Sequence, residues 1–402
     1  MIDHQTPLGS GFGARSTASD VLAGRDLTGR FAVVTGGHSG LGIETTRALA
    51  AAGAEVLVAA RDPDAARIAT QDIPRTTVDA LDLSDLGSVR RFAEGVLQAG
   101  RPIDWLINNA GLMACPETRV GPGWEAHFAT NHLGPFALTN RLLPLLASGA
   151  RVIVLSSAGH HLSPIRWNDV MFSGGYDKWH AYGQSKTANA LFAFHLDRLG
   201  RDRGIRAFSL HPGKIFTPLQ RHLTRAEMIA EGWLDAQGAP VDPTFKTPAQ
   251  GAATQVWAAT SPLLDGLGGL YCEDCDVAVR AEVAGAPFVG VKAYAVDPDA
   301  AARLWALSVK LTETGFPEGS AVPVRDRAVR RYATFGGRSP LRSIWRCRCP
   351  KQLAALAIVA RTSQALADNG GDDDGGRVTG RHPPDARTCH DCTSPQYRLR
   401  ST

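Results

Sequence analysis

Short apolar runs that alternate with helical patterns are the feature that most limits how this chain can fold. Buried strands joined by helices form parallel sheets covered on both faces, and right-handed crossovers make a doubly wound sheet the natural arrangement. We therefore predict an α/β fold with a doubly wound parallel sheet of about seven strands. We expect strands at residues 31–35, 55–60, 77–81, 104–108, 151–156, 205–210 and 269–272. Helical patterns cover residues 43–52, 63–70, 84–98, 182–199 and 300–311.

The composition changes near residue 315 and divides the chain into three parts. Residues 27–315 hold the alternating elements, and we predict that they form one domain. Residues 1–26 are a polar, glycine-rich extension with one short helix at residues 18–22. Residues 316–402 are rich in Arg, Gly, Pro, Asp and Ser, and we expect this basic low-complexity tail to be disordered.

The positive charge of the chain is concentrated in this tail. The formal net charge of the whole chain is +4, while residues 321–402 alone hold 14 Arg and 1 Lys against 7 Asp. The main domain is therefore slightly acidic, and we expect it to bind no nucleic acid. An alternative stays open for the tail, which could tether the protein to nucleic acid or to an acidic partner.

Neither the start of the chain nor its cysteines indicate export. The sequence does not open on a basic segment followed by an apolar run, and its seven cysteines are an odd number. We therefore expect a cytoplasmic protein without a disulfide framework or a membrane anchor. Four cysteines of the tail have spacings that zinc sites use, but the residues between them lack a folded pattern, so we predict no metal site. They are Cys347, Cys349, Cys389 and Cys392.

A glycine-rich turn separates the first predicted strand from the first predicted helix. It reads Thr35-Gly-Gly-His-Ser-Gly-Leu-Gly42, one residue longer than the common dehydrogenase fingerprint. Glycines let the backbone turn sharply and approach a diphosphate, and the helix N-terminus offers free N–H donors. The turn predicts a Rossmann fold that binds a dinucleotide, with a plain strand-to-helix turn as the alternative. The predicted contacts are Thr35, Gly36, Ser39, Gly40, Leu41 and Gly42.

The ends of the following strands indicate which dinucleotide binds. Ala60-Arg61 ends the second strand, where an acid would bind the ribose of NAD and an arginine can hold the 2′-phosphate of NADP. We therefore predict NADP(H) in preference to NAD(H); the alternative for Arg61 is a solvated surface charge. Further cofactor contacts are expected after the third and fourth strands. They are Asp82, Leu83, Asn109, Ala110 and Gly111.

Tyr182-Gly-Gln-Ser-Lys186 places a phenol and an ammonium group four residues apart in a predicted helix. Residues at i and i+4 share one helix face, so both side chains point the same way. A nearby ammonium favours the phenolate and lowers the pKa of the phenol towards the range that proton transfer needs. We predict Tyr182 as the catalytic acid and base, with Lys186 as its partner. The alternative is an exposed helix pair.

Two further polar residues complete the predicted catalytic group. Ser156-Ser157 ends the fifth strand, at the edge where such sheets bind ligands, and a hydroxyl there can donate to a substrate oxygen. Asn131 lies in the helix after the fourth strand. It could hold a water against the Lys186 ammonium, or it could be a helix-kink or packing residue.

Together these residues resemble the short-chain dehydrogenase/reductase family. The resemblance covers residues 27–311 and is greatest to the retinol-dehydrogenase-like and WW-domain-oxidoreductase-like branch of actinobacterial type. Lys214-Ile215 departs from the small or apolar residues that are usual in this branch. The resemblance rests on Thr35–Gly42, Asn108–Gly111, Asn131, Ser157, Tyr182, Lys186 and His211-Pro212-Gly213.

This resemblance implies roles that the residues alone do not. It implies a catalytic tetrad of Asn131, Ser157, Tyr182 and Lys186, with Ser157 rather than Ser156 at the substrate oxygen and Lys186 also on the nicotinamide ribose. It implies a homodimer that pairs through the helices of Asn131 and Tyr182. Further cofactor contacts follow from it at Pro212, Gly213 and Thr217.

Aromatic residues gather in the two segments that we expect to cover the substrate, residues 161–181 and 219–242. They predict an apolar pocket for a lipophilic small molecule. The function predicted is hydride transfer between nicotinamide and a carbonyl or alcohol carbon, with Tyr182 as the acid and base. The alternative is a regulatory protein that senses the dinucleotide without turnover. The aromatic residues are Trp167, Phe172, Tyr176, Trp179 and Trp233.

Overall fold

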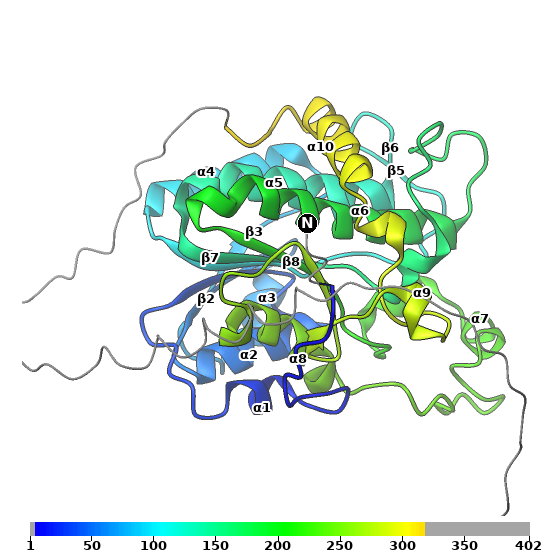
Figure 1. The fold of residues 1–402 in the computed structure, drawn as a ribbon, viewed down its shortest axis with the longest axis horizontal. Coiled ribbons are helices and arrows are strands. Elements are labelled where there is room, and N and C mark those ends of the chain that lie inside the picture. Colours follow the sequence, from blue (N-terminus) through cyan, green and yellow to red (C-terminus); the bar gives the residue numbers. More distant parts are fainter. Residues whose placement is uncertain (1–4, 318–402) are drawn as a thin grey trace, which may run out of the picture. The chain divides into compact units, whose positions relative to one another are not determined.

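The central feature of the computed structural model, which describes residues 5–317, is one eight-stranded sheet (Figure 1). The strand order is β10-β9-β8-β7-β4-β1-β2-β3, and every neighbouring pair is parallel except β9 and β10. The strands are β1 (Phe31–Thr35), β2 (Glu55–Ala60), β3 (Thr76–Ala80), β4 (Ile103–Asn108), β7 (Leu146–Leu155), β8 (Arg206–His211), β9 (Leu270–Glu273) and β10 (Asp276–Val277). A separate antiparallel pair consists of β5 (Arg119–Val120) and β6 (Trp124–Glu125).

The α/β class and the doubly wound parallel sheet are confirmed, with one strand more than predicted. The extra strand is β10, which returns beside β9 through a tight turn at Asp274 and Cys275. Both turn residues have positive φ, +50° and +62°, as a two-residue hairpin requires. Asp-Cys is not one of the glycine-containing pairs that mark such turns in a sequence, so this hairpin escaped prediction.

Helices cover both faces of the sheet. The helices are α1 (Ala18–Leu22), α2 (Gly40–Ala51), α3 (Pro63–Thr70), α4 (Leu86–Ala99), α5 (Gly134–Leu142), α6 (Lys178–Gly200), α7 (Arg225–Ala230), α8 (Pro248–Thr260), α9 (Ala281–Ala284) and α10 (Pro298–Thr312). In Figure 1, α4, α5 and α6 lie above the sheet, and α1, α2 and α8 lie below it. Side chains of successive strand residues point to opposite faces, so each strand contributes to both layers.

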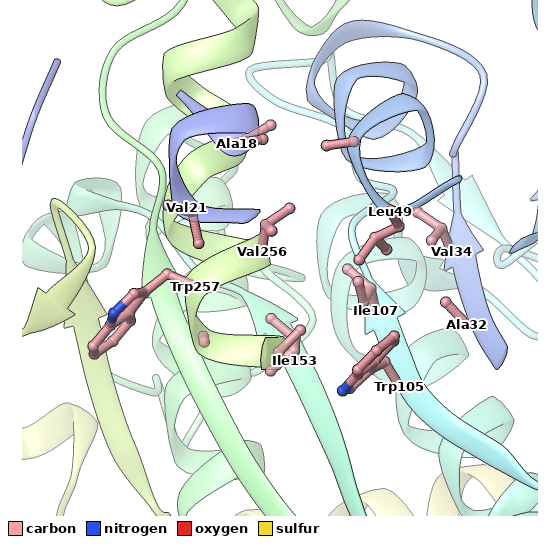
Figure 2. Close-up of a cluster of buried hydrophobic side chains, with 14 of the residues drawn as sticks. Ala18, Val21, Ala32, Val34, Leu49, Trp105, Ile107, Ile153, Val256 and Trp257 are labelled. Atoms are coloured by element: carbon pink, nitrogen blue, oxygen red, sulfur yellow. The ribbon is translucent and has the colours of Figure 1, made fainter. Parts of the chain in front are cut away.

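The core therefore consists of two layers separated by the sheet. Figure 2 shows the layer in which Leu49 of α2 and Val256 of α8 pack on Ile107 of β4 and Ile153 of β7. Neighbouring strand residues, such as Leu106, belong to the opposite layer beneath α4, α5 and α6. Burying apolar area on both faces of each strand is what makes the strands read as continuous apolar runs.

The segment before the first strand packs on this domain. Ala18 and Val21 of α1 are buried against α8 in the layer of Figure 2. Gln5 is also buried, and its side-chain amide donates to the carbonyls of Tyr271 and Ala278 at 2.7 Å. The predicted helix at residues 18–22 is present, and the polar extension proves to bury part of its length.

The predicted helices differ from the observed ones at two places that matter for the site. Helix α6 begins at Lys178 rather than at Tyr182, because the Asp177 side chain caps it by accepting from the His180 N–H. Tyr182 therefore lies in the second turn. Helix α8 was not predicted at all, because it is apolar on most of its surface and lacks a one-sided pattern.

The predictions for the tail concern almost entirely residues 318–402, which lie outside the described residues. They are the expected disorder, the zinc alternative at the four cysteines, and the tether to nucleic acid. Within residues 5–317, no helix combines the length and the apolar character that crossing a bilayer would require. The same residues contain no group of three or more His, Cys, Asp and Glu side chains that could hold a metal ion.

Candidate active site

The carboxyl ends of the strands open onto a cavity of about 920 Å³. The structure places all the predicted site residues around this cavity except Gly42 and Asn131, which lie just behind its wall. The predicted residues that line it are Thr35, Gly36, Ser39, Gly40, Leu41, Arg61, Asp82, Leu83, Asn109, Ala110, Gly111, Ser157, Tyr182, Lys186, Pro212, Gly213 and Thr217.

The glycine turn forms one end of the cavity because bare backbone is required there. Gly36 and Gly40 have φ values of +64° and +54°, which side chains disfavour. At Gly42 an added Cβ would lie 2.1 Å from the Gly36 carbonyl oxygen, so helix α2 could not start where it does. Asn109 ties the turn to β4 by donating from Nδ2 to the Thr35 carbonyl at 2.9 Å. This cradle leaves N–H groups at the start of α2 free for a phosphate.

Cationic side chains line the same end of the cavity. Arg61 follows β2, and among the described residues neither it nor Arg221 forms an ion pair with a carboxylate. The Arg221 guanidinium donates to the Pro218 carbonyl at 3.1 Å. Burial and the positive charge of Arg61 both lower the pKa of Arg221, so the two guanidinium groups lie close enough to repel each other. His38 adds a buried Nδ1 without a hydrogen-bond partner in the described part of the chain. Two guanidinium groups without a carboxylate partner fit an anionic group of a dinucleotide.

Arg221 and His38 were missed by the sequence reasoning. Arg221 lies in a short 3-10 helix, Pro218–His222, within a segment that was expected only to cover the substrate. No spacing rule connects this segment to Arg61, because 160 residues separate the two side chains along the chain. His38 lies inside the glycine turn itself, and a histidine between glycines could have been noticed as a candidate contact.

Tyr182 and Lys186 lie on one face of α6, as their spacing predicts. The Lys186 Nζ lies 5.6 Å from the centre of the Tyr182 ring and donates to the Leu155 carbonyl at 3.0 Å. The Ser157 side chain hydrogen-bonds the Tyr182 hydroxyl and accepts from the Gly159 N–H at 3.0 Å. Ser156 is occupied elsewhere, because its hydroxyl donates to the Lys186 carbonyl at 2.7 Å. Ser157 is therefore the serine whose hydroxyl faces the phenol.

Burial dominates the electrostatics of this pair. It raises the pKa of Tyr182 to about 12, against a smaller lowering by the Ser157 hydrogen bond. It also lowers the pKa of Lys186 to about 8. The structure therefore does not show the expected lowering of the phenol pKa by the ammonium. Burial disfavours the charged phenolate more strongly than the Lys186 ammonium at this distance stabilises it. The phenol is held in its protonated form at neutral pH.

Asn131 lies in a π-helical turn, Phe128–Leu133, that precedes α5. Its side chain accepts from the Leu112 N–H at 2.8 Å, and it donates to the Leu112 carbonyl and to the Ser185 hydroxyl at 3.0 and 2.9 Å. These three bonds tie the segment after β4 to α6. They favour the alternative in which Asn131 acts at a helix irregularity and positions its neighbours.

The remaining cofactor-side residues shape the wall mainly through their backbone. The Asp82 carboxylate accepts from the Ser84 N–H and hydroxyl at 2.8 and 2.6 Å, so it is engaged in its own turn. Gly213 has a φ of +104°, and an added Cβ there would lie 2.7 Å from the Lys246 side chain. Thr217 caps the helical turn that follows it. The unusual Lys214 also lines the cavity, and its ammonium group pairs with Asp242 at 2.6 Å.

The two predicted covering segments contribute unequally to the other end of the cavity. Trp179 and Trp233 line it, together with Phe245 and Phe288, which the sequence reasoning did not single out. The other three predicted aromatic residues lie outside the cavity. Phe172 is fully buried, Trp167 packs under the Arg303 guanidinium, and the Tyr176 hydroxyl donates to the Cys115 carbonyl.

A doubly wound parallel sheet, a glycine cradle at its first crossover and a tyrosine–lysine pair on α6 define a dinucleotide-dependent oxidoreductase. A family model described as short chain dehydrogenase matches residues 30–228. The chain is 49% identical over 292 residues to a probable oxidoreductase of Streptomyces lividans, a match that covers 70% of this chain and 96% of that protein. The chain belongs to the short-chain dehydrogenase/reductase family.

Two further relatives support the predicted branch of this family. Human retinol dehydrogenase 11 is 37% identical over 293 residues, covering 71% of this chain and 86% of that protein. The short-chain dehydrogenase/reductase prx1 of Penicillium rubens is 36% identical over 313 residues, covering 75% and 91%. A crystal structure of an uncharacterised protein from Mycobacterium paratuberculosis aligns with a TM-score of 0.59 at 36% identity, over 75% of this chain and 99% of that one. The chain is thus an oxidoreductase of the retinol-dehydrogenase-like branch, and the family binds a nicotinamide dinucleotide.

Proposed function

We propose that the protein transfers a hydride between NADP(H) and a carbonyl or alcohol carbon of a lipophilic small molecule, with Tyr182 as the acid and base. One observation carries this proposal. The Tyr182 hydroxyl is buried at the cavity wall between the glycine cradle and the aromatic end, with Ser157 bonded to it and Lys186 one helical turn away. A phenol in this position meets a substrate at the point where the two ends of the cavity join.

The proton chemistry follows from the residues around the phenol. When bound, the dinucleotide supplies or accepts the hydride. In reduction, Tyr182 donates its hydroxyl proton to the carbonyl oxygen, while the Ser157 hydroxyl donates a hydrogen bond to the same oxygen as charge develops. A phenol whose pKa is about 12 is protonated at neutral pH, which suits the role of proton donor to a carbonyl oxygen. Lys186 provides positive charge beside the phenol, and Asn131 positions the segment after β4.

The preference for NADP(H) rests on the cationic end of the cavity. Arg61 follows β2, where an acidic residue would bind the ribose hydroxyl of NAD, and Arg221 brings a second guanidinium close to it. Guanidinium groups match the geometry of a phosphate, so we propose that both bind the 2′-phosphate. His38 adds a donor or acceptor at the same end.

The lipophilic substrate is proposed from the opposite end. Trp179, Trp233, Phe245 and Leu219 line it, and they belong to or pack against an apolar cluster around Tyr182. An apolar wall with a few convergent polar groups is typical of sites that bind apolar small molecules. The regulatory alternative, a sensor without turnover, does not explain why a phenol is buried beside a serine hydroxyl in the cavity wall.

We also propose a dimer interface and a cellular location for the protein. Trp305 of α10 packs on Phe136 of α5 and Phe192 of α6, so part of the helix pair expected to form a homodimer is already covered within the chain. We propose that any homodimer uses the part of α5 and α6 that α10 leaves free. Size-exclusion chromatography with light scattering tests this. A cytoplasmic location is proposed from the free thiols of Cys115, Cys272 and Cys275, and cell fractionation tests it.

The test of the function is NADPH oxidation over a panel of lipophilic ketones and aldehydes, with the wild type beside Tyr182→Phe. We expect turnover by the wild type and a loss of at least ~100-fold in the variant, because only the acid is removed. Tyr294→Phe is the matched control, since its hydroxyl donates to the His160 carbonyl outside the cavity. No turnover by the wild type, despite tight NADPH binding, would favour the sensor.

A further inference from the structure

A second group of reactive side chains lies beside the same cavity and takes no part in the proposed hydride transfer. It consists of Cys115, which follows β4, with His127 and Glu125 from the segment around β6. The Cys115 Sγ lies 3.7 Å from the His127 Nε2 and 3.8 Å from its Nδ1, and the Glu125 Oε1 lies 2.8 Å from the same Nδ1. All three are buried, with exposed fractions of 4%, 0% and 0%. Burying a carboxylate, an imidazole and a thiol together requires that they satisfy one another.

The hydrogen bonds of Glu125 determine which nitrogen of His127 faces the thiol. The Glu125 carboxylate accepts from the N–H groups of His127 and Phe128 at 2.9 and 2.7 Å, so it is held as an acceptor. We therefore assign the proton of the imidazole to Nδ1, which donates to Glu125. This leaves Nε2 as the acceptor nitrogen, which the Cys115 backbone N–H approaches at 3.4 Å and the Cys115 Sγ at 3.7 Å. A thiol, an imidazole base and an orienting carboxylate form the arrangement that activates nucleophiles.

The electrostatics of His127 agree with a role as a base. Burial pushes the pKa of His127 down, but its hydrogen bonds to Cys115 and Glu125 and the charge of Glu125 outweigh burial and raise the pKa above its usual value. A raised pKa means that the imidazole holds a proton more readily than a free histidine does.

Cys115 is also the only cysteine among the described residues that reaches the cavity. It lines the cavity together with Tyr182, whose ring lies 6.1 Å from the His127 ring. The Tyr176 hydroxyl donates to the Cys115 carbonyl at 2.8 Å and fixes its backbone. Cys272 and Cys275 are buried between β9 and α8, and among the described residues no histidine bonds to either. Cys272 and Cys275 therefore serve as internal controls for Cys115, which is the thiol with a histidine beside it.

We propose that Cys115 is a nucleophile that forms a covalent adduct with α,β-unsaturated carbonyl compounds bound in this cavity, with His127 as its base and Glu125 as the residue that orients the base. The thiol proton moves to His127, and the sulfur adds to the β-carbon of the ligand. A carbon–sulfur bond forms as the carbon–carbon π bond breaks. His127 then returns the proton to the α-carbon, so no oxidant or reductant is consumed.

This adduct would block the cavity and would inactivate the enzyme when an unsaturated carbonyl accumulates. The assignment of the ligand class rests on the proposed function, since a pocket that accepts lipophilic carbonyls admits their unsaturated relatives. The reactivity of the thiol does not rest on it, because no step involves Tyr182 or the dinucleotide.

The test is the alkylation rate of Cys115 in the folded, full-length protein, followed by peptide mass spectrometry. Two probes are used, N-ethylmaleimide and the lipophilic enone 1-octen-3-one. We expect Cys115 to react while Cys272 and Cys275 stay unmodified. Glu125→Gln and His127→Gln should each slow the reaction of Cys115 by about tenfold or more, because thiolate formation then lacks its base.

Several outcomes would overturn the proposal. They are a Cys115 that stays unmodified in the folded wild type, or a rate that Glu125→Gln and His127→Gln leave unchanged. Glu125→Gln keeps the size and shape of the side chain, so it serves where His127→Gln fails to fold; near-wild-type thermal unfolding is required of each variant. Tyr182→Phe should retain Cys115 labelling. A failure of the hydride-transfer proposal and a failure of this one are therefore distinguishable.

Discussion

The two ends of the cavity are built in different ways. The cofactor end is made of strand termini and glycines, and its shape is held by backbone groups, as in the bond from Asn109 to the Thr35 carbonyl. The substrate end is made of long segments between the strands and helices, and aromatic rings hold it together. Phe216 stacks on Phe245 at 4.1 Å, and the Trp233 ring meets Phe245 at 5.8 Å.

This difference shows where change is tolerated. A backbone cradle admits no added atom at Gly42, so its function should fail sharply when it is altered. An aromatic wall can lose one ring and keep the others, so its function should decline gradually. The shared boundary between the two ends is the phenol of Tyr182, which must serve a ligand from each side.

Gly42→Ala should give the largest effect at the cofactor end. Because its Cβ would lie 2.1 Å from the Gly36 carbonyl oxygen, the turn must shift, and we expect NADPH affinity to fall by at least ~100-fold. Gly13→Ala is the control, since that glycine has no neighbouring atom within 4 Å of the added Cβ. Fluorescence titration with NADPH measures both. Equal affinities would mean that the cradle is not what binds the dinucleotide.

Arg61→Gln and Arg221→Gln should each weaken the binding of NADPH but not that of NADH. A lost charge-assisted bond to phosphate is expected to weaken NADPH binding by about 10- to 100-fold and to leave NADH binding unchanged. Calorimetric titration of each variant with both cofactors provides the measurement. If both cofactors weakened equally, the arginines would bind a phosphate that NADPH and NADH share, and a tighter wild-type affinity for NADH would refute the predicted preference.

The pH dependence should report Lys186, which lies between the two ends. Burial lowers its pKa to about 8, so the side chain is an ammonium below that pH and a neutral amine above it. We expect the rate of carbonyl reduction to be level below pH 8 and to fall about tenfold for each further pH unit, because the positive charge beside the phenol is lost. Lys186→Arg keeps its charge and should show no fall near pH 8. Identical pH–rate profiles for the wild type and Lys186→Arg would show that Lys186 does not cause the fall in rate.

Trp233→Ala should give the smallest effect, because other rings of the substrate end remain. We expect the KM of a lipophilic carbonyl to rise by about tenfold, with NADPH affinity unchanged. Trp167→Ala is the matched control, since this indole lies outside the cavity with Arg303 packed on its ring at 4.2 Å. Steady-state kinetics with saturating NADPH measure both variants. A loss of NADPH affinity in Trp233→Ala would contradict the division of the cavity into a cofactor end and a substrate end.

The same division describes what the sequence could predict. Strand ends, the glycine turn and the i, i+4 pair follow from local periodicity, and the predicted residues surround one cavity as expected. Arg221 and Phe245 belong to long connections whose path over the cavity depends on tertiary packing, and no local pattern marks them. Of the aromatic residues predicted from covering segments, Trp167, Phe172 and Tyr176 pack elsewhere for the same reason.

The pKa of the Tyr182 phenol was the second property that the sequence did not predict correctly. Spacing alone placed Lys186 beside Tyr182 correctly, yet it suggested a lowered phenol pKa. The structure shows a fully buried phenol whose pKa is raised to about 12, because burial is a property of the whole fold. In the proposed mechanism, Tyr182 therefore starts as the protonated donor.

The central claim is that the Tyr182 hydroxyl delivers the proton where the two ends of the cavity meet. Single-turnover reduction of a carbonyl by wild type and by Tyr182→Phe, each saturated with NADPH, tests it most directly. The account predicts that both bind NADPH equally and that hydride transfer in the variant is at least ~100-fold slower. An equally fast hydride transfer in Tyr182→Phe would contradict it.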